Sequence, residues 1–274
     1  MIRDITIGQY YPAKSILHRL DPRVKLVSTL LYLISLFLFK SIPGYIVATV
    51  FLITVIQMSR VPISFIVKGL KPIIMLLLIT VLFNLFLTRD GDVLFHAWIF
   101  TITEGGLRTA VYMAIRLIYL IIGSSLMTFT TTPNELTDGI ESLLHPLNKI
   151  RVPVHEVAMM MSIALRFIPI LLEETDKIMK AQIARGADLE NGNIIQRAKN
   201  MIPILVPLFV SAFRRANDLA MAMEARCYRG GEGRTKMKPL QYKRRDYVAY
   251  VSVAIYVVAV FVIGRYVPLH VWIF

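Results

Sequence analysis

The chain has 274 residues, of which 56% are apolar and 18% charged, and its mean hydropathy is +0.60. A soluble domain of this length is usually less apolar, so the composition indicates a membrane protein with several spans. Its one cysteine, Cys227, excludes an intramolecular disulfide and a multi-cysteine metal site. The formal net charge of +13 must be tested against membrane topology before a nucleic-acid partner is considered.

Five stretches are apolar and long enough to be candidate spans, for which a bilayer needs roughly 20 residues. They cover residues 24–40, 43–58, 72–88, 107–128 and 247–267. Asp21 and Pro22 open the first as N-cap and first helical residue. The first two are short and separated by a tight turn at 40–44, so one bent, re-entrant hairpin is the alternative. The connection 89–106 is predicted to be a short hairpin or an interfacial segment.

Lysine and arginine residues are distributed unequally among the connections. Residues 1–23, 59–71 and above all 131–245 carry most of the 31, whereas the connections on the opposite side carry few. With five spans, the positive-inside rule places the N-terminus in the cytoplasm and the C-terminus outside. Topology therefore explains the charge without nucleic acid, and the sequence contains no recognised nucleic-acid motif.

The region 131–245 differs from the rest because it is rich in charges. Thr132 to Glu135 form a capping box that opens an amphipathic helix. A long helix is predicted from about 154 to 185, ended by Gly186, and another from about 196 to 226. The sequence thus predicts an all-α polytopic membrane protein in three parts. These are an N-terminal membrane domain (1–130), a cytoplasmic or interfacial domain of long helices (131–245) and a C-terminal transmembrane helix (246–274).

Both long helices end in the pattern Ala-x-x-Ala-Arg, at 181–185 and 222–226, and an Ile-Pro-Ile-Leu run precedes each. Pro169 lies 16 residues before the first arginine, and Pro203 lies 23 residues before the second. The difference of seven residues is two helical turns, so each arginine has nearly the same angular position relative to its proline. The matched pair predicts docking to a paired partner. Two unrelated alanine-rich helix ends are the alternative.

An arginine at a helix end offers a rigid fork of donors that stays charged, and it can bind a carboxylate or backbone carbonyls in a groove. Small alanines beside it let the helix end approach such a groove. Alternatively, each arginine only interacts favourably with the helix dipole, by about 0.3–1 kcal/mol.

Residues 202–213 are apolar on nearly all sides, so this half of the second helix must be buried in protein or lipid. A conventional span over 194–213, which would place the second arginine outside, is the rival interpretation.

Other chemistry is poorly represented. His155-Glu156 begins like a zinc-protease motif, but Met159 stands where the second histidine is required. Neither a Gly-x-Ser-x-Gly nor a Walker A sequence occurs. Arg116, inside a predicted span, could mark an anion pathway or pair with a neighbouring helix, and we favour the second. We therefore predict no catalytic residue, metal or cofactor. An intramembrane enzyme and a stand-alone secondary transporter are the alternative functions.

Several motifs resemble those of the transmembrane coupling (T) components of energy-coupling factor (ECF) vitamin and metal transporters. The resemblance covers nearly the whole chain. Ala184-Arg185-Gly186 matches one Ala-Arg-Gly motif and Ala225-Arg226 two thirds of the other, with Cys227 where that motif has glycine. The cysteine leaves the role of the arginine intact but makes the geometry of the helix end an open question. The other matching segments are 17–26, 103–107 followed by Arg116, 132–136 and 144–147.

The resemblance implies a non-catalytic scaffold in a bacterial-type plasma membrane. Its partners would be two ATP-binding-cassette (ABC) ATPases, as a homo- or heterodimer, and a membrane substrate-binding (S) subunit, either exchangeable or dedicated, for vitamin or metal uptake. The two long helices would cross in an X. The ATPase-docking residues would be Ala184, Arg185, Gly186, Ala225, Arg226 and Cys227. ATP hydrolysis would belong to the partners.

Seven of the 13 methionines lie between 155 and 226. Methionine is adaptable and suits a surface that accepts several partners, although it also fills gaps in helical cores. We predict that an apolar face of the long helices contacts the S subunit. Its residues would be Met159, Met160, Met161, Ile163, Phe167, Leu171, Ile204 and Leu208.

Overall fold

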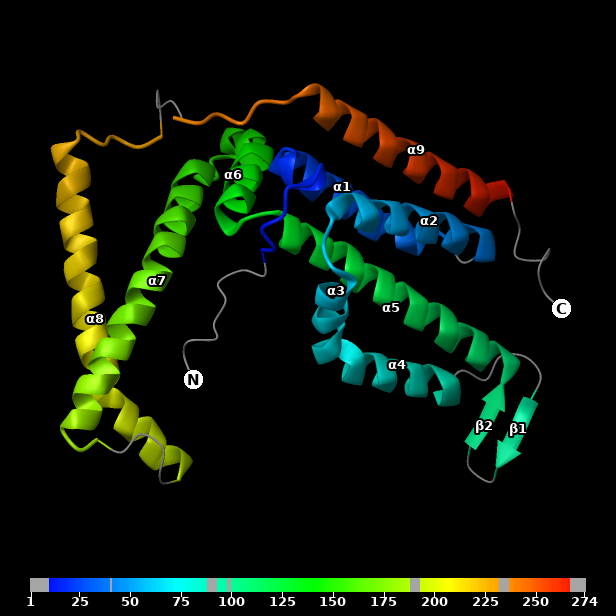
Figure 1. Ribbon diagram of the computed structural model, residues 1–274, viewed down its shortest axis with the longest axis horizontal. Helices are drawn as coiled ribbons and strands as arrows, with labels where there is room; N and C mark the ends of the chain where they lie inside the picture. The colour runs from blue at the N-terminus through cyan, green and yellow to red at the C-terminus, as the bar shows by residue number, and fades with distance from the viewer. Residues whose placement is uncertain are drawn as a thin grey trace. The chain divides into compact units, whose positions relative to one another are not determined.

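The computed structural model describes residues 10–39, 41–87, 93–97, 100–187, 193–231 and 237–266. Helices dominate these ranges (Figure 1). The first half contains η2 (Leu17–Arg19), α1 (Pro22–Leu38), α2 (Ile42–Ser59), α3 (Ile63–Leu70), η3 (Lys71–Ile73) and α4 (Ile74–Leu87). The second half contains α5 (Glu104–Thr130), α6 (Pro133–Leu144), η4 (His145–Ile150), α7 (Val154–Ala184), α8 (Ile194–Ala225) and α9 (Arg244–Tyr266).

A two-stranded antiparallel sheet interrupts the helices between α4 and α5 (Figure 1). β1 (Val93–Ala97) pairs with β2 (Phe100–Thr103), and the register shifts between Val93 and Phe95. Of the two alternatives for the connection 89–106, the short hairpin is the one that the described residues form, and 89–92 and 98–99 lie outside them. Thr103 then caps α5, because its side chain accepts a hydrogen bond from the Gly106 amide. Within the described ranges the fold is all-α apart from this hairpin.

Contacts divide the chain into two compact units. The bundle unit comprises α1–α5, most of α6, and α9, and the long-helix unit comprises residues 140–239 with α7 and α8. The C-terminal helix α9 thus packs with the N-terminal helices although 113 residues lie between the end of α5 and the beginning of α9. The three-part division at 130 and 245 stays a prediction.

Four helices in the described ranges are long and apolar enough to cross a membrane: α2, α5, α7 and residues Arg244–Arg265 of α9. α3 and α4 form a fifth candidate as one pair bent by 61°. A multi-pass membrane protein is therefore confirmed, with three differences from the predicted spans. This bent pair stands in place of the single span predicted over 72–88, and the other two differences concern α1 and α7. α1 has 17 residues, or about 26 Å, against roughly 30 Å of hydrocarbon. α7, predicted as an interfacial helix, is apolar enough to be a candidate.

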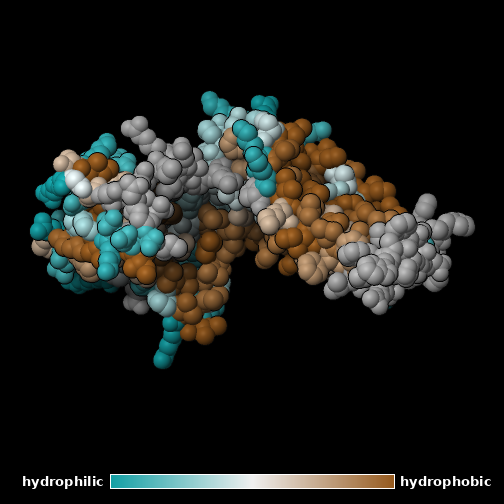
Figure 2. Space-filling model, turned by 90° about the horizontal axis from the view of Figure 1, so that it is seen from below, coloured by the Kyte–Doolittle hydropathy of each residue, from teal (hydrophilic) through white to brown (hydrophobic). Residues whose placement is uncertain are grey.

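Large apolar side chains lie on the outside of the bundle unit. Phe37 on α1, Met75 on α4 and Ile255 on α9 are all more than half exposed. Hydrophobic residues cover broad areas of the surface in Figure 2. A soluble protein rarely exposes so much contiguous apolar surface, whereas in a bilayer these side chains face lipid.

The core of the bundle unit joins α1, α2, α3, α5 and α9 through aromatic residues. Phe51 on α2 stacks on Tyr256 of α9 with 4.2 Å between ring centroids, and Tyr45 on α2 stacks on Tyr112 of α5 at 5.3 Å. The Tyr256 hydroxyl lies 2.9 Å from Ser35 Oγ on α1, so its polar group has a partner inside the core. These contacts fix α9 against the first two helices.

A buried carboxylate joins the beginnings of α1 and α9. Asp246 is 1% exposed; its Oδ1 accepts from the Asp21 amide at 2.9 Å and its Oδ2 from the Lys243 amide at 2.7 Å. Burial opposes ionisation of Asp21, but hydrogen bonds and charge from Arg23 outweigh it and hold the pKa of that carboxyl below its usual value. The Arg23 guanidinium also lies over the Tyr242 ring at 3.9 Å. Asp21 and Arg23 therefore hold the beginning of α1 against the beginning of α9 and the residues just before it.

We expect Asp246→Ala to lower the free energy of unfolding by about 2–4 kcal/mol, because two amide donors lose their shared acceptor. Asp246→Asn keeps one acceptor oxygen, so its free energy of unfolding should lie between those of the unmodified chain and Asp246→Ala. Denaturant unfolding of the detergent-solubilised full chain, followed by circular dichroism, measures the effect. Asp218→Ala, at an exposed position on α8, is the control; equal midpoints for Asp246→Ala and Asp218→Ala would refute the prediction.

Candidate functional site

The predicted docking residues lie at the ends of two antiparallel helices, α7 and α8. Gln182 Nε2 donates to the Pro203 carbonyl at 3.2 Å, and Arg215 Nη2 donates to Glu174 Oε2 at 3.4 Å. Higher numbers on α7 thus face lower numbers on α8. The two ribbons cross and then diverge toward the end of α8 (Figure 1). Arg185 and Arg226 therefore lie at opposite ends of the pair, about 35 Å apart at 1.5 Å per residue.

Local sequence sets the bounds of both helices close to the predicted ones. Asn193 forms a capping box with Gln196 at the beginning of α8. The predicted capping box before α6 is also present, because the Glu135 amide donates to Thr132 Oγ1 and the Thr132 amide to Glu135 Oε2. Pro169 lies inside α7, and Pro203 and Pro207 lie inside α8, which changes direction along its length in Figure 1.

The two arginine ends share one backbone geometry. After Arg185, the Gly186 amide donates to the Ile183 carbonyl at 2.9 Å and the Ala187 amide to Gln182 at 3.0 Å. After Arg226, the Cys227 amide donates to the Glu224 carbonyl at 2.8 Å and the Tyr228 amide to Met223 at 3.0 Å. Both sets are the paired hydrogen bonds of a Schellman motif, with the arginine as C-cap.

Cys227 adopts the left-handed conformation that the motif requires. Its φ is 55°, against 87° for Gly186 at the equivalent position. A side chain in this region costs roughly 1–2 kcal/mol, which explains why glycine is usual there. The helix end nevertheless keeps the Schellman hydrogen bonds, so replacing glycine by cysteine preserves the geometry.

Both ends are open to a partner. All six predicted docking residues are exposed: Ala184, Arg185, Gly186, Ala225, Arg226 and Cys227. Among the described residues neither Arg185 nor Arg226 forms an ion pair. Amide groups, rather than the guanidinium groups, satisfy the last carbonyls of each helix. Both cations can therefore bind another molecule.

The eight residues predicted to contact the S subunit differ in how exposed they are. Met160 and Met161 are 58% and 43% exposed, whereas Ile204 is buried. The other five residues of that prediction are half-buried: Met159, Ile163, Phe167, Leu171 and Leu208. An α7 surface carrying the two exposed methionines is thus accessible.

Sequence reasoning missed one contact in the long-helix unit. His155 Nδ1 lies 3.0 Å from Glu141 Oε1, and the ring packs against Gly231. No cluster of metal-binding side chains is present in the part of the chain that the structure describes. The two adjacent glycines, 230 and 231, are the one local signal near this contact, and by themselves they indicate only a turn.

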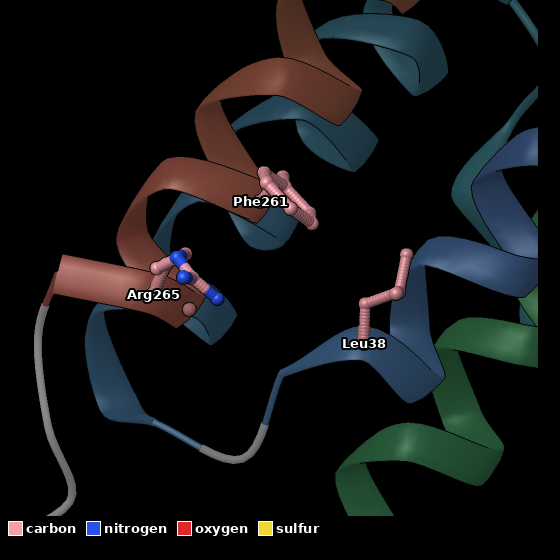
Figure 3. Close-up of a pocket in the computed structure, with 4 residues that line it drawn as sticks. Leu38, Phe261 and Arg265 are labelled. Atoms are coloured by element: carbon pink, nitrogen blue, oxygen red, sulfur yellow. The ribbon is translucent and has the colours of Figure 1, made fainter.

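Two further features belong to the bundle unit. Arg116 Nη2 donates to the Phe39 carbonyl at 3.3 Å, so α5 contacts the end of α1 as the favoured interhelical interpretation requires. A recess of about 710 Å³ lies between the ends of α1 and α9 (Figure 3). Leu38, Phe261, Gly264 and Arg265 line it, and this lining has one cation and no acid–base pair among the residues that the structure describes.

We expect Cys227→Val to weaken the end of α8 by about 1–2 kcal/mol, because a β-branched residue fits the left-handed region poorly. Cys227→Gly should be neutral or stabilising by up to about 1 kcal/mol. Hydrogen exchange of the Tyr228 amide, which donates to Met223, measures both changes. Equal exchange rates in the valine and glycine variants would show that this backbone conformation is not held.

Comparisons with known proteins bear on the whole chain. Residues 13–237 match the CbiQ family, described as "Cobalt transport protein". The chain is 58% identical to the energy-coupling factor transporter transmembrane protein EcfT of Clostridium kluyveri over 266 residues, 97% of this chain and 98% of the relative. It is 50% identical to the EcfT of Bacillus subtilis over 255 residues, 93% of this chain and 96% of the relative.

A third relative, the EcfT of Ruminiclostridium cellulolyticum, is 55% identical over 246 residues, 90% of this chain and 92% of the relative. These matches extend across the bundle unit and both arginine-ended helices, and the fold has the several apolar helices of a membrane protein. The chain therefore belongs to the CbiQ family, and within it to the transmembrane components, EcfT, of energy-coupling factor transporters.

Proposed function

We propose that this chain is the non-catalytic scaffold that transmits movements of two cytoplasmic ABC ATPases to a membrane-embedded S subunit, for uptake of a vitamin or a metal. The observation that carries the proposal is the pair of exposed arginines held in the same Schellman geometry. ATP binding and hydrolysis belong to the partner ATPases.

The antiparallel arrangement suits a paired partner. Two antiparallel helices with equivalent ends are related by an approximate two-fold axis, and a dimer of similar ATPases has a two-fold axis of its own. Each ATPase would receive one arginine. Because the hydrogen-bonded caps fix the backbone before binding, docking orders little more than the arginine side chains.

The distribution of charge supports a cytoplasmic location for the arginine ends. The last part of α7 carries Glu173, Lys177 and Lys180, all of them exposed. Each charged side chain costs about 2.5–3.5 kcal/mol at the centre of a membrane helix, so this part of α7 favours water. We place the N-terminus in the cytoplasm and the C-terminus outside, which the excess of Lys and Arg in 131–245 supports.

The apolar side of α7 is the proposed contact for the S subunit. Met160 and Met161 are exposed on α7, and half-buried Ile163, Phe167 and Leu171 follow them along the helix. A methionine-rich surface can repack against different partners, which suits an exchangeable subunit.

Reversal of either arginine should weaken capture of the ATPase pair. Truncating one partner of a buried charge contact costs about 2–5 kcal/mol, so we expect Arg185→Glu and Arg226→Glu each to weaken binding at least about 30-fold, and the double variant to lose it. Co-purification of the full chain with the ATPases in detergent measures the loss. Arg214→Glu, exposed but away from both ends, is the matched control.

The cysteine beside Arg226 gives an independent measurement. It is exposed and is the only thiol of the chain, so maleimide labelling should be fast in the free chain and slow in the ATPase complex. Equal capture by all variants, with labelling unchanged by the ATPases, would contradict docking at these ends. Substrate uptake by the purified chain alone would instead favour a stand-alone transporter.

Met160→Ser combined with Met161→Ser should reduce co-purification of the S subunit at least about tenfold while ATPase capture stays unchanged, because burial of each side chain is worth about 1.5–3 kcal/mol. Both positions are exposed, so the fold should tolerate the change. Met237→Ser, at a side chain 95% exposed, is the control. Normal recovery of the S subunit with the double variant would remove these methionines from the interface.

A further inference from the structure

The chain that leaves the end of α8 returns to the beginning of α7. Residues 227–231 follow Arg226, and Gly231 packs on the ring of His155 in the first turn of α7. Figure 1 shows α7 and α8 diverging toward this end, with the chain after α8 crossing the gap. The two helices are also joined directly by the hydrogen bonds from Gln182 to Pro203 and from Arg215 to Glu174. The α7–α8 pair is therefore linked both by these bonds and through the chain that follows α8.

The contact at Gly231 is close and specific. A Cβ atom at this position would lie 2.5 Å from His155 Cδ2, 2.9 Å from Cγ and 3.2 Å from Cβ. These atoms include the base of the side chain, and Glu141 on α6 holds the ring through Nδ1 at 3.0 Å. The imidazole cannot swing away without breaking that contact. Position 231 therefore needs glycine while His155 is in place.

The length of the segment limits the movement of the second arginine. Gly231 follows Arg226 by five residue steps, so the extended chain between them reaches at most about 18 Å. The turn at Gly230, with φ of 92°, shortens it further. A displacement of Arg226 beyond this reach must move Gly231 as well, and so disturbs its packing on His155 and the contact of His155 with Glu141 between α7 and α6.

We propose that residues 227–231 are a tether that transmits displacement of the Arg226 end to the joint between α6 and α7, with Gly231 and His155 as its positioning residues. The inference rests on the proposed function, because the displacement comes from the ATPase that docks on Arg226. The tether adds to that function a path by which displacement of Arg226 reaches the beginning of α7, which lies at the same end of the pair.

Lengthening the tether tests this in the complete transporter. Inserting two glycines between Tyr228 and Arg229 extends its reach to about 25 Å and leaves both arginine ends intact. We expect unchanged ATPase capture and continued ATP hydrolysis, but at least tenfold less substrate uptake per ATP hydrolysed. The same insertion directly after Gly231 lengthens the chain beyond the contact and should leave coupling near that of the unmodified chain.

A disulfide provides a reversible version of the same test. In a Cys227→Ser background, Gly231→Cys and His155→Cys would bring two Cβ atoms about 3.2 Å apart on the present backbone, near the range for a disulfide. Oxidation should restore uptake per ATP, and reduction should abolish it. The Cys227→Ser chain without the pair shows whether the background itself couples normally.

The possible results distinguish failure of the tether from failure of the proposed function. If the unmodified chain captures no ATPases, the proposed function fails. If capture and uptake are normal but neither the insertion nor the redox state changes uptake per ATP, the tether is refuted and the proposed function stands. Equal losses with both insertions would show that total chain length between α8 and α9 matters, and would likewise overturn the tether.

Discussion

The first amides and the last carbonyls of a helix have no partner within that helix, and in lipid they cannot be left without one. The described residues meet this constraint with partners from other elements. Asp246 accepts from the amide of Asp21 before α1, Lys25 Nζ donates to the Thr130 carbonyl at the end of α5 at 2.7 Å, and Arg116 donates to Phe39 after α1. Charged side chains of the bundle unit therefore join its helices by hydrogen bonds to the backbone at helix ends.

The long-helix unit meets the same constraint differently. The carbonyls at the ends of α7 and α8 accept hydrogen bonds from the amides that follow them, so no side chain is required to cap them. This leaves the guanidinium groups of Arg185 and Arg226 exposed to solvent. A self-contained cap also makes the shape of each end independent of its surroundings, which suits a surface that must bind a separate protein.

Two kinds of connection thus coexist in the chain. Stacked aromatic rings such as Phe51 and Tyr256 hold the bundle core together, and the Tyr256 hydroxyl forms a hydrogen bond with Ser35 inside it. The α7–α8 pair is joined by a few polar contacts and by the Gly231–His155 packing. Fewer buried contacts make relative movement of α7 and α8 easier than movement within the bundle core, as a part that transmits motion requires.

Local patterns in the amino-acid sequence determined much of this protein by themselves. Apolar runs, the capping box at Thr132 and Glu135, and the repeated arginine pattern predicted the elements and the exposed ends, because neighbours in sequence control helix initiation, termination and exposure. The bend between α3 and α4 was missed, because hydropathy alone does not show where a span breaks. α7 was predicted as an interfacial helix because its last part carries charges, although its length and hydropathy suffice for a span. Only the tertiary structure placed Asp246 beside Asp21, 225 residues away, and Gly231 on His155. Such contacts depend on how completed helices pack, and no local pattern encodes that packing.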